Sequence, residues 1–128
     1  MQVLLDTTAF LKWVEGDPGL PRKTHAIIAN ADNDCLVSTA SAWEIAIKCG
    51  LGKLRLSLPA GRYVADHVIA NGFRLLDIEL RHVARVELLE HHHRDPFDRL
   101  LAAQALEENL AVVSANQIFR KYGVKRIW

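Results

Sequence analysis

The sequence predicts an α/β fold in which a parallel sheet lies between two layers of helices. Short apolar runs alternate with amphipathic segments along the chain, which is the pattern of a strand–helix–strand series. The runs do not alternate between apolar and polar residues, as expected for strands that are buried on both faces. The 128 residues leave room for one well-formed core, so we interpret residues 1–128 as a single domain.

Five apolar runs are the candidate strands. The first covers residues 3–5 and ends at Asp6-Thr7-Thr8, and the second covers residues 35–38. The remaining runs cover residues 73–78, 110–114 and 124–128, of which the last is short. No repeat, low-complexity tract or linker interrupts this series.

Helical periodicity fills the intervals between the runs. The predicted helices cover residues 9–14, a segment that includes 26–29, one from Ser41 to Gly50 or Gly52, residues 59–71, residues 80–89, one that begins at Pro96, and a short one at Ile118 and Phe119. Ser41 and Glu44 have the spacing of a capping box, which predicts a helix start at that point. Residues 114–117 repeat this spacing with Gln as the fourth residue.

The segment from His91 to Leu106 is predicted to open the central helix. Asp95 is a good N-cap, Pro96 suits the first helical position, and Asp98 falls at the third. Apolar Phe97, Leu100 and Leu101 recur at helical spacing after it. We therefore expect this face of the helix to pack in the core.

Composition restricts the possible functions. Sixteen Lys and Arg against fifteen Asp and Glu give a net charge of +1, so a basic surface for nucleic acid would have to be local. Cys35 and Cys49 do not make a disulfide framework, which favours a reducing compartment. No uncharged run approaches the ~18 residues of a membrane span, and the first residues do not form a signal peptide. We expect a cytoplasmic protein with no membrane partner.

Polar side chains follow the predicted strands at the edge where parallel sheets bind ligands. Asp6 comes directly after the first strand, and Glu44 follows the second by a few residues. Asp98 begins the helix that leads into the fourth strand, and Asn116 follows that strand. These side chains are therefore expected to gather on one edge, each near the N-terminus of a helix.

Three carboxylates in one cleft repel each other unless a cation or a proton joins them. Hard oxygen ligands suit Mg²⁺ or Mn²⁺, and such an ion can promote hydrolysis of a phosphodiester. Asp6, Glu44 and Asp98 are therefore candidate metal ligands. Each acid also has a structural interpretation: Asp6 could cap the first helix, Asp98 could complement a helix dipole, and Glu44 could serve only its capping box and a pair with Lys48.

Other side chains that carry chemistry have weaker patterns. Three consecutive histidines, His91-His92-His93, do not converge on one metal ion, which favours contact with RNA or with solvent. Lys12, Lys48, Lys53, Arg94 and Arg99 flank the acids in the sequence. These cations are candidate phosphate contacts, with an ordinary solvated surface as the alternative. Trp13 and Trp43 fall on apolar helix faces and are predicted to be core residues.

Four motifs in the chain carry a family resemblance. They are Leu4-Leu5-Asp6-Thr7, Ser41-Ala42-Trp43-Glu44-Ile45, Gly50-Leu51-Gly52-Lys53-Leu54 and His92-His93-Arg94-Asp95-Pro96-Phe97-Asp98-Arg99-Leu100-Leu101. Their residues and order resemble the PIN-domain family, most closely its VapC-like toxins, over essentially the whole chain. The resemblance implies a three-layer α/β/α fold with a parallel five-stranded sheet and Mg²⁺- or Mn²⁺-dependent endoribonuclease activity. It also implies a cognate antitoxin and a homodimer.

The family's acidic site carries over onto Asp6, Glu44 and Asp98, with Asp95 as a neighbour that assists or only caps. The family commonly has a fourth acid in a Thr-Ala-Asp motif, where this chain has Ser114-Ala115-Asn116. Asn keeps an oxygen ligand but loses the charge. We therefore expect a ribonuclease toxin in which Asp6 and Asp98 hold the ion, Glu44 completes the pocket, and Asn116 orients a water molecule.

Two other functions fit parts of the pattern. Asn116 motivates a catalytically weak or inactive PIN-like module that binds RNA or antitoxin without cutting. A phosphoacceptor signalling domain also gathers acids at the ends of parallel strands. That domain would need paired acids after the first strand, where this chain has Asp6 followed by Thr7-Thr8.

Overall fold

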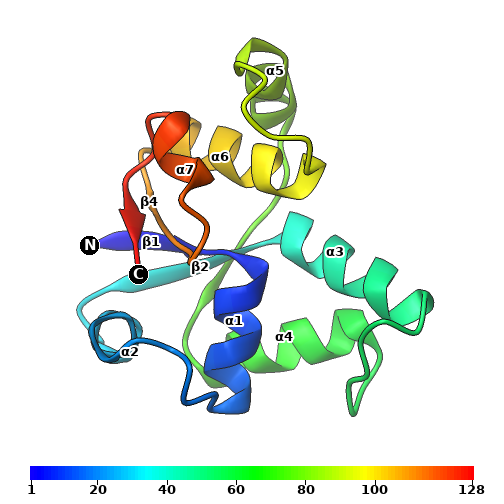
Figure 1. Ribbon diagram of the computed structural model, residues 1–128. Helices are drawn as coiled ribbons and strands as arrows, with labels where there is room; N and C mark the ends of the chain where they lie inside the picture. The colour runs from blue at the N-terminus through cyan, green and yellow to red at the C-terminus, as the bar shows by residue number, and fades with distance from the viewer.

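The computed structural model describes residues 1–128 and places a five-stranded sheet between two groups of helices (Figure 1). The strand order is β3-β2-β1-β4-β5, and every neighbouring pair is parallel. The strands are β1 (Gln2–Leu5), β2 (Asp34–Ser38), β3 (Arg74–Leu76), β4 (Ala111–Val113) and β5 (Arg126–Ile127). The predicted α/β/α fold with a parallel five-stranded sheet is confirmed.

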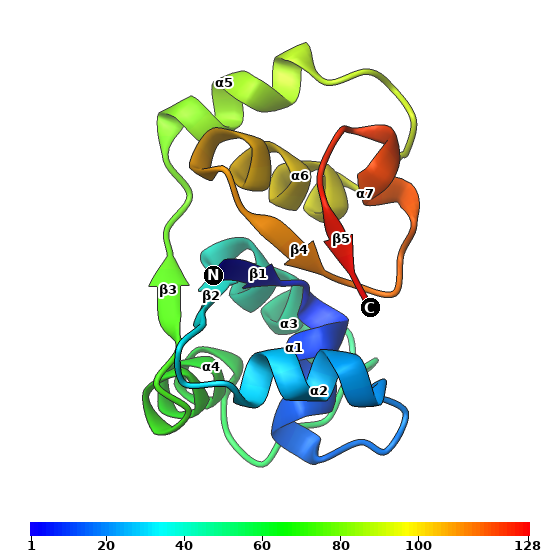
Figure 2. The same cartoon turned by 90° about the vertical axis from the view of Figure 1, so that its left-hand side faces the viewer.

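Seven helices cover the two faces of the sheet. They are α1 (Thr7–Glu15), α2 (Arg22–Ala29), α3 (Thr39–Gly50), α4 (Ala60–Ala70), α5 (Leu80–Leu88), α6 (Pro96–Glu108) and α7 (Ile118–Lys121). Figure 2 shows α1, α2 and α4 on one side of the strands and α5, α6 and α7 on the other. None of these helices combines the length and apolar composition that crossing a membrane requires.

The central strand β1 supplies both halves of the core. Val3 and Leu5 belong to one apolar cluster and Leu4 to the other, and all three side chains are fully buried. Successive side chains of a strand point to opposite faces, so an all-apolar run is what a strand covered on both sides requires. The position of β1 between β2 and β4 brings the carboxyl ends of three strands to one edge.

The helix α3 begins earlier than the sequence predicts, and the capping box of Ser41 and Glu44 is absent. The N-cap is Ser38, whose hydroxyl accepts a hydrogen bond from the Ala40 N–H at 3.0 Å. Ser41 is buried in the first turn of the helix, where its hydroxyl accepts from Thr7 Oγ1 at 2.9 Å. Ser38, at the end of β2, accepts a hydrogen bond from an N–H group that has no partner within the helix. The hydroxyl of Ser41 is therefore free to join α3 to α1.

The second predicted capping box is also wrong. The Ser114 hydroxyl accepts from the Asn116 N–H at 2.9 Å, and Asn116 Oδ1 accepts from the Ile118 N–H at 3.0 Å. The helix α7 begins at Ile118, and Gln117 makes no side-chain cap. Short Ser and Asn side chains bond to backbone groups two residues ahead, so two successive local turns replace the box.

The aromatic and apolar side chains differ in part from the predicted core. Trp43 is 55% exposed and meets only the edge of the Phe97 ring, at 5.1 Å between ring centroids, so its assignment to the core is wrong. Trp13 is half-buried and packs against the cluster that contains Val3. On α6, Leu101 is buried, whereas residues 97 and 100 are only partly buried.

Candidate functional site

Asp6 lies at the carboxyl end of β1 and also caps α1, so it has both of the roles that the sequence suggested: strand-end acid and helix cap. Its N–H donates to the carbonyl oxygen of Val113 at 3.1 Å, which continues the pairing of β1 with β4. Its Oδ1 accepts from the Ala9 N–H at 2.7 Å, so Asp6 is also the N-cap of α1. The residue is only 8% exposed, and a carboxylate is therefore held in a largely dry place.

Asp98 comes from the first turn of α6, where the predicted helix start is confirmed. Asp95 is the N-cap and accepts from the Phe97 N–H at 2.9 Å, and Pro96 occupies the first turn. Asp98 follows at the third helical position, and its Oδ2 lies 3.0 Å from His93 Nε2. The same oxygen accepts from Asn116 Nδ2 at 3.3 Å.

Glu44 is the third acid and comes from α3. Its Oε2 lies 2.9 Å from Lys48 Nζ, which is the predicted pair across one helical turn. The carboxylate is nevertheless 14% exposed, whereas the lysine is 47% exposed. An exposed partner of this kind contributes little stability and leaves the field of Glu44 only partly screened.

The three acids act on one another electrostatically. Burial raises the pKa of Asp6 to about 6, hydrogen bonds from Ser114 and from the Ala9 N–H oppose this, and the charges of Asp98 and Glu44 raise it further. The pKa of Asp98 is also raised, first by burial and then by Asp95, with His93 acting in the opposite direction. Asp98 and Glu44 therefore lie near enough to Asp6 for their charges to act on it, at the sheet edge that the strand-end pattern predicts.

Asn116 lies beside these acids but does not present its oxygen to them. Its amide group donates from Nδ2 to Asp98, whereas its Oδ1 is engaged by the Ile118 N–H. The side chain is exposed at the start of the turn before α7. Its position is thus the one predicted, but its contact is that of a donor that holds Asp98.

His93 is the residue nearest the acids that sequence reasoning missed. Ligand atoms of His93, Asp95 and Asp98 lie within 4.8 Å of one another. The three histidines do not converge as a group, as predicted, because His92 instead lies 2.9 Å from Glu90 Oε2. Nothing in the run of identical residues shows which imidazole turns toward the helix, since that depends on the path of the loop.

The donor set fits a hard divalent cation. Neither Asp6 nor Asp98 has a lysine or arginine partner, and burial together with neighbouring carboxylates raises the pKa of each. A cation that joined these oxygens would relieve both the burial of charge and the repulsion. Oxygen ligands of this type suit Mg²⁺ or Mn²⁺, so the residues present are compatible with the ion that the sequence predicts.

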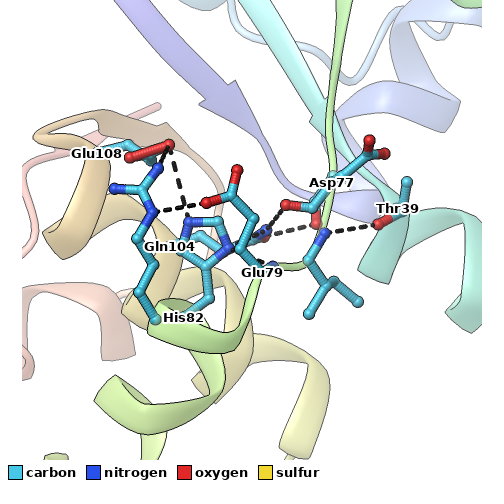
Figure 3. Close-up of polar contacts among 9 residues, drawn as sticks. Thr39, Asp77, Glu79, His82, Gln104 and Glu108 are labelled. Carbon is cyan, nitrogen blue, oxygen red and sulfur yellow. Dashed lines mark hydrogen bonds and ion pairs between the residues drawn. The ribbon is translucent and has the colours of Figure 1, made fainter.

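A buried polar network behind the site ties α3 to α6. The Ser38 hydroxyl donates to Gln104 Oε1 at 2.5 Å, and Gln104 Nε2 lies 3.3 Å from His82 Nδ1. Figure 3 shows Gln104 and His82 meeting beside the start of α5, with Thr39 on the other side of the chain that leads into it. The Thr39 hydroxyl accepts from the Ile78 N–H at 3.1 Å. These contacts fix the helix of Glu44 relative to the helix of Asp98.

The parallel sheet with acids at its strand ends defines a class of α/β protein that carries an acidic site. Comparison of the sequence with known families shows which family of that class the chain belongs to. The sequence model of the PIN domain matches residues 3–125, so the chain belongs to the PIN-domain family. Over 62 residues the chain is 42% identical to ribonuclease VapC16 of Mycobacterium tuberculosis. That match covers 48% of this chain and 44% of the relative, so it spans less than half of either protein.

Several solved structures have a similar fold. VapBC2 of Rickettsia felis, bound to a DNA fragment from its promoter, matches with a TM-score of 0.74 at 16% identity and covers 99% of this chain and 98% of its own. DNA-bound VapBC of Salmonella typhimurium matches at 0.71 with 18% identity, covering 99% and 97%. FitAcB of Neisseria gonorrhoeae matches at 0.66 with 17% identity, covering 98% and 96%. At these identities the likeness shows a shared fold.

Proposed function

We propose that this protein is a metal-dependent endoribonuclease that hydrolyses RNA phosphodiester bonds and acts as the toxin of a toxin–antitoxin pair. The observation that carries the proposal is the convergence of Asp6, Glu44 and Asp98, from three separate parts of the chain, on one edge of the sheet. Burial and neighbouring carboxylates raise the pKa of Asp6 and of Asp98, and a bound cation would offset both effects. The similarity to ribonuclease VapC16 supports the reaction class.

In this proposal Asp6 and Asp98 hold Mg²⁺ or Mn²⁺, and Glu44 completes the acidic pocket. When bound, the ion supplies a Lewis acid that stabilises negative charge on the phosphodiester and activates water. Lys48 occupies Glu44 Oε2, so the other carboxylate oxygen remains to accept a hydrogen bond from water. Asn116 acts through its amide N–H, which orients Asp98 Oδ2 toward the pocket.

The direct test is RNA cleavage by the purified protein with EDTA, with Mg²⁺ and with Mn²⁺. We expect cleavage only with a divalent ion, and Asp6→Asn and Asp98→Asn should abolish it. Asp32→Asn, which removes an exposed carboxylate outside the site, is the matched control and should cut as the wild type does. Cleavage that persists in EDTA, or in both site variants, would overturn the proposal.

We also propose a cognate antitoxin and a homodimer. One structure of similar fold, from Klebsiella pneumoniae, is a toxin–antitoxin complex, which supports the partner, whereas the dimer rests on family resemblance. Clustered carboxylates favour an antitoxin arginine that pairs with them through two parallel hydrogen bonds. Such a partner should compete with the metal, which a calorimetric metal titration with and without antitoxin would measure. Light scattering should give twice the chain mass of 14.4 kDa.

A second candidate function is a weak or inactive module that binds RNA or antitoxin without cutting. The Asn116 amide favours it, because this side chain brings no charge to the acids and offers them an N–H group. Metal and RNA binding without cleavage at saturating Mg²⁺ and Mn²⁺ would select this function over the nuclease.

A further inference from the structure

Beside the acidic site lies a hollow whose wall is entirely basic or imidazole. Its volume is about 640 Å³, and no apolar or acidic residue lines it. We call it the basic pocket, and its lining residues are His91, His92, His93, Arg94 and Arg99. All five come from the segment that links α5 to α6 and from the first turn of α6, next to Asp98.

The deepest residue of the basic pocket is a buried arginine with no acidic partner. Arg99 is only 9% exposed, and its guanidinium donates to the Glu90 carbonyl oxygen at 2.8 Å, to the Tyr122 hydroxyl at 3.1 Å and to the Val86 carbonyl oxygen at 3.4 Å. All three acceptors are neutral. Buried charges in proteins are normally paired with an opposite charge, whereas no carboxylate contacts this guanidinium.

The mouth of the basic pocket holds donors that no protein group uses. Arg94 is exposed and makes neither a hydrogen bond nor an ion pair, and the same is true of His91. Two of the lining imidazoles do face acids. His92 Nε2 lies 2.9 Å from Glu90 Oε2, and His93 Nε2 lies 3.0 Å from Asp98 Oδ2. A neutral imidazole still offers one N–H group, so the free donors at the mouth need no change of protonation.

We propose that the basic pocket binds a backbone phosphate of the RNA strand, next to the phosphate that the acids would engage; this inference rests on the proposed nuclease function. Arginine presents a planar fork that matches phosphate oxygens, and Arg94 at the mouth with Arg99 behind it supplies that chemistry. The contact of His93 with Asp98 makes the two sites share a wall. A strand that follows the protein surface therefore passes from one to the other.

The basic pocket would also offset the repulsion between the acidic site and the phosphates of RNA. Asp6, Glu44 and Asp98 repel an approaching phosphate until a cation is present, so they provide no affinity for metal-free RNA. A basic pocket on the adjoining wall supplies that affinity without the ion. RNA binding and metal binding should then be separable, and this property allows the pocket to be tested apart from cleavage.

The experiment measures binding of a fluorescently labelled single-stranded RNA oligonucleotide by anisotropy, in EDTA, with the 128-residue chain. Arg94→Gln combined with His91→Gln should weaken binding about 5- to 10-fold and reduce the salt dependence by roughly 0.7 for each phosphate that the variant no longer neutralises. Lys23→Gln is the matched control, because Lys23 is exposed on α2, across the sheet from the pocket. Its affinity should equal that of the wild type.

Unchanged RNA affinity and salt dependence in the double variant would overturn the proposal that the basic pocket binds RNA, whether or not the protein cleaves RNA. Weaker binding in that variant supports the pocket even if no form of the protein cuts, in which case only the nuclease proposal fails. Inorganic phosphate serves as the competitor. Displacement of RNA only at millimolar phosphate supports a backbone site, whereas micromolar binding of phosphate that leaves RNA bound would overturn it in favour of a small anion.

Discussion

Asp6 combines a structural contact with a destabilising charge. Its Oδ1 caps α1, and asparagine is about as good an N-cap as aspartate, so Asn at this position should keep the hydrogen bond to Ala9. Its pKa is about 6 in the folded protein against a usual value of 3.8. A raised carboxyl pKa means that the folded state holds the proton more tightly than the unfolded state. The associated stability is present below pH 4 and is lost as pH rises through 6.

The first prediction is that Asp6→Asn stabilises the metal-free protein at pH 8. Two units of pKa correspond to about 3 kcal/mol, which is an upper limit for the gain. The gain should shrink between pH 6 and pH 4, where the wild-type carboxyl becomes protonated in the folded state. Urea unfolding at several pH values measures it. A loss of stability at pH 8 would show that Asp6 acts mainly as a cap.

A second prediction concerns Asn116→Asp. Asn116 Nδ2 lies 3.3 Å from Asp98 Oδ2, so the substitution replaces an attraction with a repulsion between carboxylates. We expect lower stability without metal and tighter Mg²⁺ binding, by roughly 1–3 kcal/mol for one added charge in a partly solvated site. Calorimetry gives the affinity, and the cleavage rate at limiting Mg²⁺ should rise with it. Equal affinities in the two proteins would mean that position 116 serves only the turn before α7.

At the scale of elements, the buried network behind the site fixes how α3, α5 and α6 meet. His82 is fully buried, and its Nδ1 accepts from the Glu79 N–H at 3.0 Å while lying 3.3 Å from Gln104 Nε2. Its Nε2 faces Glu108 at 3.8 Å and has no hydrogen-bond partner. The ring therefore carries its hydrogen on Nε2, and Figure 3 shows it lodged between α5 and α6.

The third prediction is that His82→Ala costs about 2–4 kcal/mol, because it opens a cavity and leaves the Glu79 N–H and one N–H of the Gln104 amide without an acceptor. The exposed Trp43 provides the contrast, since Trp43→Ala should cost about 1 kcal/mol or less despite its larger side chain. Chemical denaturation of the two variants measures the difference. A smaller loss for His82→Ala than for Trp43→Ala would show that the buried network does not hold these helices together.

The sequence predicted the elements better than their contacts. All five strands lie within two residues of the predicted runs, since apolar runs depend on burial alone. The placement of Asp6, Glu44 and Asp98 at one edge was predictable because parallel topology sends strand ends to that edge. The start of α3 was misplaced because Ser38 and Ser41 are equally good caps and only the end of β2 selects between them. The exposure of Trp43 and the burial of Arg99 depend on tertiary packing, which periodicity does not encode.

At the scale of the whole molecule, binding of an ion should stabilise the fold in a manner that depends on pH. A ligand that binds only the folded state at 100 times its Kd adds about 2.7 kcal/mol. Carboxylates must lose their protons to bind metal, so the pKa of about 6 at Asp6 makes binding weaker below that pH. Metal binding at the proposed site and folding would therefore be thermodynamically linked.

The fourth prediction follows from this linkage. Saturating Mg²⁺ should raise the Tm of the wild type at pH 8, raise it less at pH 5, and leave Asp6→Asn almost unchanged at either pH. Thermal unfolding with Mg²⁺ and with EDTA measures the increments, and Asp32→Asn should behave as the wild type does. Equal increases in Tm at pH 5 and pH 8 would show that Asp6 is not a ligand of the metal.

The place of β1 at the centre of the sheet has a consequence for the protein during its synthesis. Among the five strands of the sheet β1 is synthesised first, whereas one of its two neighbours, β4, is the fourth. Until β4 arrives, β1 has an open edge, and the Val113 carbonyl that holds the Asp6 N–H is missing. Asp98 likewise arrives late in translation. Under the proposed nuclease function, the acidic site would therefore be complete only after α6 and β4 have been synthesised.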